Sequence, residues 1–328
     1  MNTKDELIDG AVLYLRIYLL GMPALGLYNF GNAVLSAAGD TKRPLYYLAF
    51  AGVVNVILNL FFVIVCHLGV AGVALASMIS QFISAFLILR ALLTGKEKYC
   101  LRLSEIRFDK RKAVGILQIG IPSAFQYSLF AFANLFVQSS VNSFDHVLVE
   151  GNSAAANADP LVYDMMAAFY TACSSFIAQN FGARKKKRIL QTYLICLFYS
   201  FITSLVLGVG IYLARYPFLY LFTSDKAVVE AGITRLSIMA LSYSASAFMD
   251  ASIAASRGLG KTAVPTFVVV MGSCVFRIIW IYTIFAYFHT IQSLYILYVF
   301  SWGITAIAEN IYFFHVYRHT LTEKKELC

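Results

Sequence analysis

The sequence predicts an all-helical protein that crosses a membrane about nine times. Apolar residues make up 60% of the 328 residues and charged residues only 13%, whereas soluble domains are nearer half apolar and a quarter charged. The apolar residues are gathered in long runs, and a helix needs about 20 such residues to cross the hydrocarbon core. The basic residues between these runs are concentrated in every second loop. We therefore expect a polytopic membrane protein in contact with lipid.

Nine segments meet this length requirement. They are too long for tilted transmembrane strands and lack strict alternation of apolar and polar residues, so we predict helices. Two of them contain a proline, Pro23 in the first and Pro122 in the fourth, and each proline predicts a kink. Pro122 is also a candidate hinge, although helix packing explains both prolines equally well. In chain order the segments are residues 12–35, 45–66, 70–93, 113–137, 154–181, 189–212, 227–255, 264–288 and 293–316.

The distribution of positive charge predicts the orientation of these segments. Of the 26 Lys and Arg residues, 19 lie in one set of alternate loops and the C-terminal tail, and only three lie on the other side. Cytoplasmic loops collect Lys and Arg, so we expect a multi-pass protein of the inner or plasma membrane with a cytoplasmic C-terminus. The same distribution explains the net charge of +9 without nucleic acid. We expect the basic run at residues 184–188 to face lipid phosphates.

An internal repeat indicates two related lobes. Gly39, Thr41 and Pro44 recur as Gly260, Thr262 and Pro265, at an offset of 221, and ten identities fall between residues 15 and 62. Parallel repeats of this kind build two-lobed transporters. We expect residues 1–93 to form the last three helices of a first lobe, 94–112 a cytoplasmic linker, 113–316 a six-helix second lobe, and 317–328 a cytoplasmic tail. The offset also predicts three more helices before residue 1, which gives twelve helices in two groups of six.

Several stretches resemble one transporter family. The segment FIAQNFGAR at residues 176–184 resembles the QNxGA stretch that closes the eighth helix of the multidrug and toxic compound extrusion (MATE) family, and it contains Gln179, Asn180 and Gly182. We expect these three residues to be structural and to cap the helix end. Further similarity lies in YLRI at 14–17, LYNF at 27–30, GDTKRP at 39–44, NVILN at 55–59, GIP at 120–122, RGLGKT at 257–262 and RIIW at 277–280.

The resemblance covers nearly the whole chain and aligns it with family helices four to twelve. It implies a V-shaped two-lobe fold, alternating access, and export of amphipathic, often cationic compounds in exchange for H⁺ or Na⁺. Some family members carry a glutamate shortly after the GxP of the seventh helix. Residues 123–130 here have no carboxylate, so the sequence leaves the coupling ion open.

Ionisable residues inside the predicted helices are candidates for coupling, because such groups are costly in a bilayer. Asp250 is interpreted either as a proton or cation site or as a structural partner of Arg277. Asp164 is either a coupling site or a polar residue facing outside water. For Glu309 we favour local pairing with Asn310 or Arg277 over a coupling role. For Arg277 we favour a buried salt bridge over direct substrate contact.

Polar residues on one predicted helix form a candidate wall for a substrate cavity. Gln126, Asn134 and Gln138 fall loosely on one helical face, and Tyr127 adjoins it. Hydrogen bonding between helices is the alternative explanation, because Asn and Gln commonly provide it in membranes.

The sequence has no pattern that points to catalysis. We find no P-loop, no HExxH and no Ser/His/Asp arrangement, and the six cysteines have no ligand spacing, so we expect neither an enzyme nor a metal site. Apart from the coupling ion we expect no cofactor, and the expected partners are the bilayer and small organic cations, with the protein a monomer. The alternatives are a flippase for lipid-linked oligosaccharides or cell-wall precursors, and an inactive gene fragment.

Overall fold

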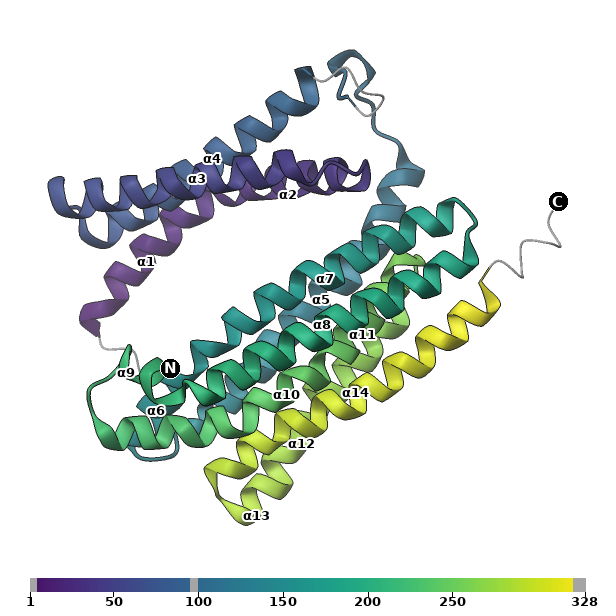
Figure 1. The fold of residues 1–328 in the computed structure, drawn as a ribbon. Helices are drawn as coiled ribbons and strands as arrows, with labels where there is room; N and C mark the ends of the chain where they lie inside the picture. The colour runs from purple at the N-terminus through teal and green to yellow at the C-terminus, as the bar shows by residue number, and fades with distance from the viewer. Residues whose placement is uncertain (1–4, 95–99, 321–328) are drawn as a thin grey trace. The chain divides into compact units, whose positions relative to one another are not determined.

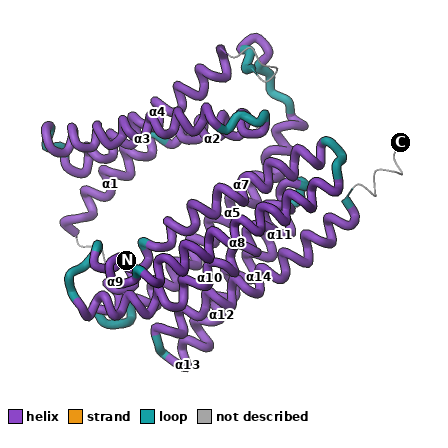
Figure 2. The backbone as a smooth tube through the Cα atoms, viewed as in Figure 1, coloured by secondary structure: helices purple, strands orange, loops and turns teal. Residues whose placement is uncertain are grey.

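The computed structural model describes residues 5–94 and 100–320, and the parts of the expected linker and tail at residues 95–99 and 321–328 lie outside them. Every described residue is in a helix or a loop, with no strand (Figure 2). Eight helical segments in this range are long and apolar enough to cross a membrane, or nine if one bent pair counts as a single span. The predicted fold class and the number of spans are therefore confirmed.

The chain divides into two compact units, Met1–Phe108 and Asp109–Cys328. The helices of the first unit are α1 (Asp5–Leu20), α2 (Met22–Ala37), α3 (Lys42–Leu60) and α4 (Gly69–Thr94). The helices of the second unit are α5 (Lys110–Val141), α6 (His146–Ala156), α7 (Ala158–Gly182), α8 (Lys186–Leu213), α9 (Arg215–Tyr220), α10 (Lys226–Gly258), α11 (Ala263–Val269), α12 (Phe276–Trp280), α13 (Ala286–Phe288) and α14 (Ile291–His319) (Figure 1).

In the first unit α4 packs against the other three helices. Tyr28 on α2 donates a hydrogen bond of 2.9 Å to the carbonyl of Pro44 and so ties α2 to the start of α3. The first predicted span is interrupted, because α1 and α2 meet at an angle of 44°. Pro23 lies at the start of α2, where a missing N–H is tolerated best.

In the second unit the long helix α10 is the most buried span, and it packs against α6, α7, α8 and α14 (Figure 1). Small residues allow the close approach. A side chain at Gly208 of α8 would collide with the backbone of Ala240 in α10. Small residues at helix interfaces are the usual means of tight packing in membranes.

The sequence repeat is also a repeat of local structure. α2 ends at Ala37 and α10 at Gly258, while α3 begins at Lys42 and α11 at Ala263, so both boundaries keep the offset of 221. In both copies the glycine after the helix has positive φ, 92° at Gly39 and 77° at Gly260. A glycine in this conformation ends a helix without steric cost.

Three parts of the sequence prediction require correction. The predicted helix 154–181 is interrupted at Asn157, so it is formed by α6 and α7, and α6 begins earlier, at His146. The predicted helix 264–288 contains π-helical turns at Val270–Val275 and Ile281–Phe285.

The third correction concerns the end of α7. Gly182 is still helical, and the residue with positive φ is Arg184, at 55°. The backbone N–H of Lys185 donates to the carbonyl of Asn180, which closes the turn. The Asn180 side chain does not cap this end, because its amide donates to the carbonyl of Phe176 within the same helix.

Candidate functional site

The second unit contains a cavity of about 630 Å³. Its wall is built by α5, α6, α7, α10, α11, α12 and α14, which are mostly parts of membrane-spanning segments. A volume of this size accommodates a drug-sized molecule. The wall is rich in aromatic side chains, namely Tyr127, Phe130, Tyr163, Tyr170, Tyr295, Tyr298 and Trp302.

All four polar residues predicted for the cavity wall lie there. Gln126, Tyr127, Asn134 and Gln138 line the cavity from α5. Gln126 also holds helices together, because its side-chain oxygen accepts hydrogen bonds from Arg257 at 3.0 Å and from Thr266 at 3.3 Å. Asn134 and Gln138 are more open, so the α5 face combines interhelical hydrogen bonding with accessible polar groups.

The three candidate carboxylates have different surroundings in the structure. Asp164 and Asp250 line the cavity, and neither forms a hydrogen bond or salt bridge with a described residue. Arg257 acts on Asp250 electrostatically, at more than salt-bridge distance. Glu309 is fully buried and does not line the cavity, and both of its oxygens lack a hydrogen-bond partner among the described residues.

The expected local pairing of Glu309 is wrong. Asn310 instead accepts a hydrogen bond of 2.6 Å from Tyr193 and donates to the carbonyls of Phe248 and Ala306. The side chains of Glu309 and Asn310 follow each other along α14 and point in different directions, because successive helical residues are about 100° apart.

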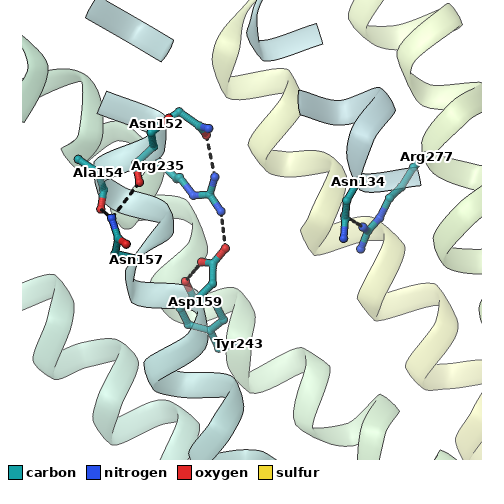
Figure 3. Close-up of polar contacts among 9 residues, drawn as sticks. Asn134, Asn152, Ala154, Asn157, Asp159, Arg235, Tyr243 and Arg277 are labelled. Atoms are coloured by element: carbon teal, nitrogen blue, oxygen red, sulfur yellow. Dashed lines mark hydrogen bonds and ion pairs between the residues drawn. The ribbon is translucent and has the colours of Figure 1, made fainter. Parts of the chain in front are cut away.

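The expected salt bridge of Arg277 is also wrong, and so is its pairing with Asp250. Arg277 is 0% exposed, and its partners are neutral: Asn134 at 2.8 Å and Ser301 at 3.3 Å. Figure 3 shows the contact with Asn134. The guanidinium also lies over the rings of Phe130 and Tyr298, at 4.7 and 4.5 Å. These partners come from α5 and α14 because α12 packs against those helices.

A buried ion pair that the sequence did not predict lies on the same cavity wall. Arg235 of α10 donates to Asp159 of α7 at 2.5 Å and to Asn152 of α6 at 2.7 Å (Figure 3). Tyr243 donates to the other oxygen of Asp159. The network therefore joins three helices. Arg235 was visible in the sequence as a charge inside a predicted span, but its partner lies 76 residues earlier.

The charged side chains of the wall consist of three arginines and three aspartates. Only Arg235 and Asp159 neutralise each other directly. Asp164, Asp250 and Arg277 have no salt bridge within the described part of the chain. Aromatic surfaces and unpaired charges in one cavity suit an amphipathic ligand that carries charge.

An all-helical bundle with membrane-spanning helices around such a cavity is the architecture of many helical membrane transporters. The MatE family model matches residues 1–61 and 122–283. The chain belongs to the MatE family, as the resemblance of its motifs predicted.

Curated relatives agree with this assignment. The chain is 33% identical over 190 residues to the probable multidrug resistance protein YpnP of Bacillus subtilis, which covers 58% of this chain and 42% of that protein. It is 23% identical over 273 residues to the probable multidrug resistance protein NorM of Thermotoga maritima, and this alignment covers 80% of this chain and 58% of that protein. A FAD transporter of Shewanella oneidensis is 25% identical over 224 residues, which cover 66% of this chain and 49% of that protein. The chain spans about half the length of these relatives.

Solved structures share the fold. A MOP superfamily transporter from Pyrococcus furiosus superimposes with a TM-score of 0.91 at 21% identity, covering 98% of this chain and 72% of that one. A multidrug resistance MATE family transporter in an outward-facing conformation gives a TM-score of 0.89 with the same identity and coverage.

Proposed function

We propose that this chain serves in a secondary antiporter that exports amphipathic organic compounds, cations among them, in exchange for H⁺ or Na⁺. One observation carries the proposal: Asp250 lies on the wall of a cavity within a membrane span and has no salt bridge or hydrogen bond among the described residues. Membership of the MatE family and relatives described as multidrug resistance proteins support the same function.

An unpaired carboxylate in this position provides a physical basis for exchange. An ionised group in an apolar span is costly unless a positive charge accompanies it. A proton, a Na⁺ ion or a cationic substrate can each supply that charge. Because Asp250 carries a single negative charge, one of them is enough to neutralise it. Binding of the coupling ion therefore favours release of the substrate, which is the requirement for antiport. Asp164, also on the wall, is a second candidate for this role.

The surroundings of Asp250 suit an organic cation. Tyr and Trp faces attract cations with about 0.5–2 kcal/mol each, and seven aromatic residues line the cavity. We further propose that the protein acts as a monomer in the plasma membrane with its C-terminus in the cytoplasm. The 19 basic residues of one loop set support that orientation.

The flippase alternative stays open because of one observation. Three arginines line the cavity, and an arginine-rich cavity suits the phosphates of a lipid-linked precursor. The three aspartates on the same wall offset this positive charge, so we favour export of small molecules.

The test is efflux of a fluorescent organic cation from cells that express the full chain, with pH and Na⁺ varied. We expect Asp250→Asn to abolish ion-driven efflux, because the amide cannot exchange a proton or hold Na⁺ as a carboxylate does. Asp225→Asn is the matched control, since Asp225 caps α10 outside the cavity and Asn is an equally good cap. Unchanged coupling in Asp250→Asn would remove this residue from the mechanism.

A further inference from the structure

Arg277 is a buried cation that lacks a counter-ion. It is 0% exposed, it lies in a membrane-spanning segment, and it lines the cavity. No carboxylate of the described chain forms a salt bridge with it. A buried charge without a partner costs several kcal/mol, so the position favours a negative charge in direct contact with Arg277, and no described carboxylate provides that contact.

The hydrogen bonds of Arg277 leave one guanidinium nitrogen unused. Nε donates to Ser301 and Nη1 donates to Asn134, while Nη2 has no partner among the described residues. Arginine can only donate, so the side-chain oxygen of Asn134 must face it. The amide nitrogen of Asn134 remains as a second donor, and it forms no hydrogen bond with a described residue. Each partner of the Arg277–Asn134 hydrogen bond thus keeps an unused N–H donor, Nη2 of Arg277 and the amide nitrogen of Asn134.

The guanidinium is also held in place. It lies over the rings of Phe130 and Tyr298, and the bond to Ser301 fixes its other side. A donor pair that is fixed before the ligand arrives binds an oxyanion with little loss of side-chain freedom. Asp159 cannot serve as the missing anion, because Arg235 and Tyr243 occupy both of its oxygens.

We infer that Arg277 and Asn134 form a binding site for an oxyanion, a carboxylate or phosphate, on the transported molecule or on a lipid headgroup. An oxyanion that enters the cavity beside Asn134 would accept from Nη2 through one oxygen and from the Asn134 amide through another. This inference rests on the proposed function, which it deepens. It assigns to the exported compounds an acidic group that Arg277 and Asn134 recognise.

The test uses two forms of one fluorescent aromatic dye, an aminoxanthylium dye with a free carboxylate and the methyl ester of the same dye. Binding is measured with the purified full chain in nanodiscs of phosphatidylcholine. We expect Arg277→Gln to weaken binding of the acid about tenfold or more, as for loss of a charged hydrogen bond, and to change binding of the ester less than about twofold. An equal change for both dyes would overturn the inference.

Asn134→Asp is the second variant, because it supplies the missing counter-ion from within the protein. The new carboxylate pairs with Arg277 and repels the acid, so we expect the acid to lose about tenfold or more in affinity. The melting temperature should stay equal or rise, which separates the effect from misfolding. If the acid binds Asn134→Asp as tightly as the wild type, Asn134 and Arg277 do not hold its carboxylate.

The source of the oxyanion is identified by a lipid comparison. If acid binding to the wild type is weaker in phosphatidylcholine nanodiscs than in maltoside detergent, which carries no phosphate, and Arg277→Gln shows no such difference, the site takes a lipid headgroup. Equal binding of the acid in nanodiscs and in detergent assigns the site to the free solute. Binding in nanodiscs needs no ion gradient. Failure of efflux with an intact difference between the dyes would therefore overturn the proposed function alone.

Discussion

At the scale of single residues, two buried arginines on one cavity wall have opposite surroundings. Arg235 is paired with a carboxylate and an amide from two other helices, whereas Arg277 has only neutral partners. Breaking a buried ion pair by removing one partner costs about 3–5 kcal/mol, because the other charge is left uncompensated. The two arginines are therefore expected to differ in what they contribute, stability from Arg235 and ligand recognition from Arg277.

We expect Asp159→Ala to lower the free energy of unfolding by about 3 kcal/mol, near the low end for a broken buried pair, because Asp159 keeps 27% exposure of its side chain. Asp164→Ala is the matched control, since Asp164 is exposed, lies on the same helix and has no hydrogen bond or salt bridge. Thermal unfolding in detergent, followed by tryptophan fluorescence, measures both variants. Equal melting temperatures would show that the pair does not stabilise the bundle.

Glu309 offers a second comparison at this scale. Its carboxylate is fully buried without a hydrogen-bond partner among the described residues, and an unpartnered charge in an apolar span is costly. Glu309→Gln keeps the shape and removes the charge, so we expect a melting temperature equal to that of the wild type or higher. A loss of more than about 1 kcal/mol, the usual contribution of one hydrogen bond, would mean that Glu309 has a partner in the membrane.

At the scale of helices, a stripe of small residues on α8 sets its distance from α10. Ser200, Ser204 and Gly208 are spaced by four and are all buried, and α8 packs closely against α10. The spacing by four places them on one face of the helix. This face allows the backbones to approach as in other membrane bundles with small residues every fourth position.

Two glycines of α8 test this packing. A Cβ at Gly208 would collide with the backbone of Ala240, whereas a Cβ at Gly210 would meet nothing within 4 Å. We expect Gly208→Ala to destabilise the protein by about 2 kcal/mol, as overpacking does. Gly210→Ala should be neutral or stabilising by up to about 1 kcal/mol, because alanine favours helix. Identical unfolding curves for the two variants would contradict the close packing.

The proline of α5 explains why Thr262 matters in the repeat. Pro122 has no backbone N–H, so the carbonyl of Gln118, four residues earlier, loses its helical hydrogen bond. The hydroxyl of Thr262 donates to this carbonyl at 3.3 Å from the start of α11. Thr262, in the second copy of the repeat, thus replaces the helical hydrogen bond that Pro122 removes from α5.

We expect Thr262→Val to lower stability by about 1 kcal/mol, the net contribution of one buried hydrogen bond. Thr41→Val is the control, because Thr41 is the equivalent residue of the first copy, starts α3 in the same way, and its hydroxyl forms no hydrogen bond with a described residue. The melting temperatures of both variants can be compared directly. An equal loss would indicate that the effect comes from the turn itself and not from the bond to Gln118.

At the scale of the whole chain, the alternation of basic and non-basic loops predicts which loops share a side of the membrane. The loop before α8 and the loop before α6 are separated by one span, His146–Gly182. We expect a cysteine at Lys185 to react with a membrane-impermeant maleimide only in everted vesicles, and one at Ser143 only in intact cells. The native cysteines are replaced first. Labelling of both positions from the same side would refute the orientation.

Much of the fold could be predicted from the sequence. Hydropathy gave the spans, and helical periodicity placed Gln126, Asn134 and Gln138 on one face, which the structure puts on the cavity wall. The break at Asn157 was missed because α6 and α7 are both apolar, so hydropathy does not separate them. The partners of Arg277 were missed because pairing with an acid is the simplest expectation for a buried cation.

The sequence by itself determined which segments of this protein lie in the membrane and that the chain belongs to a transporter family. Burial in lipid depends on the polarity of each residue and on segment length, and both can be read along the chain. Only the tertiary structure decided that Arg235 meets Asp159 while Arg277 meets Asn134. Such meetings depend on the rotation of each helix about its axis and on its offset along its neighbours, and packing between helices sets both.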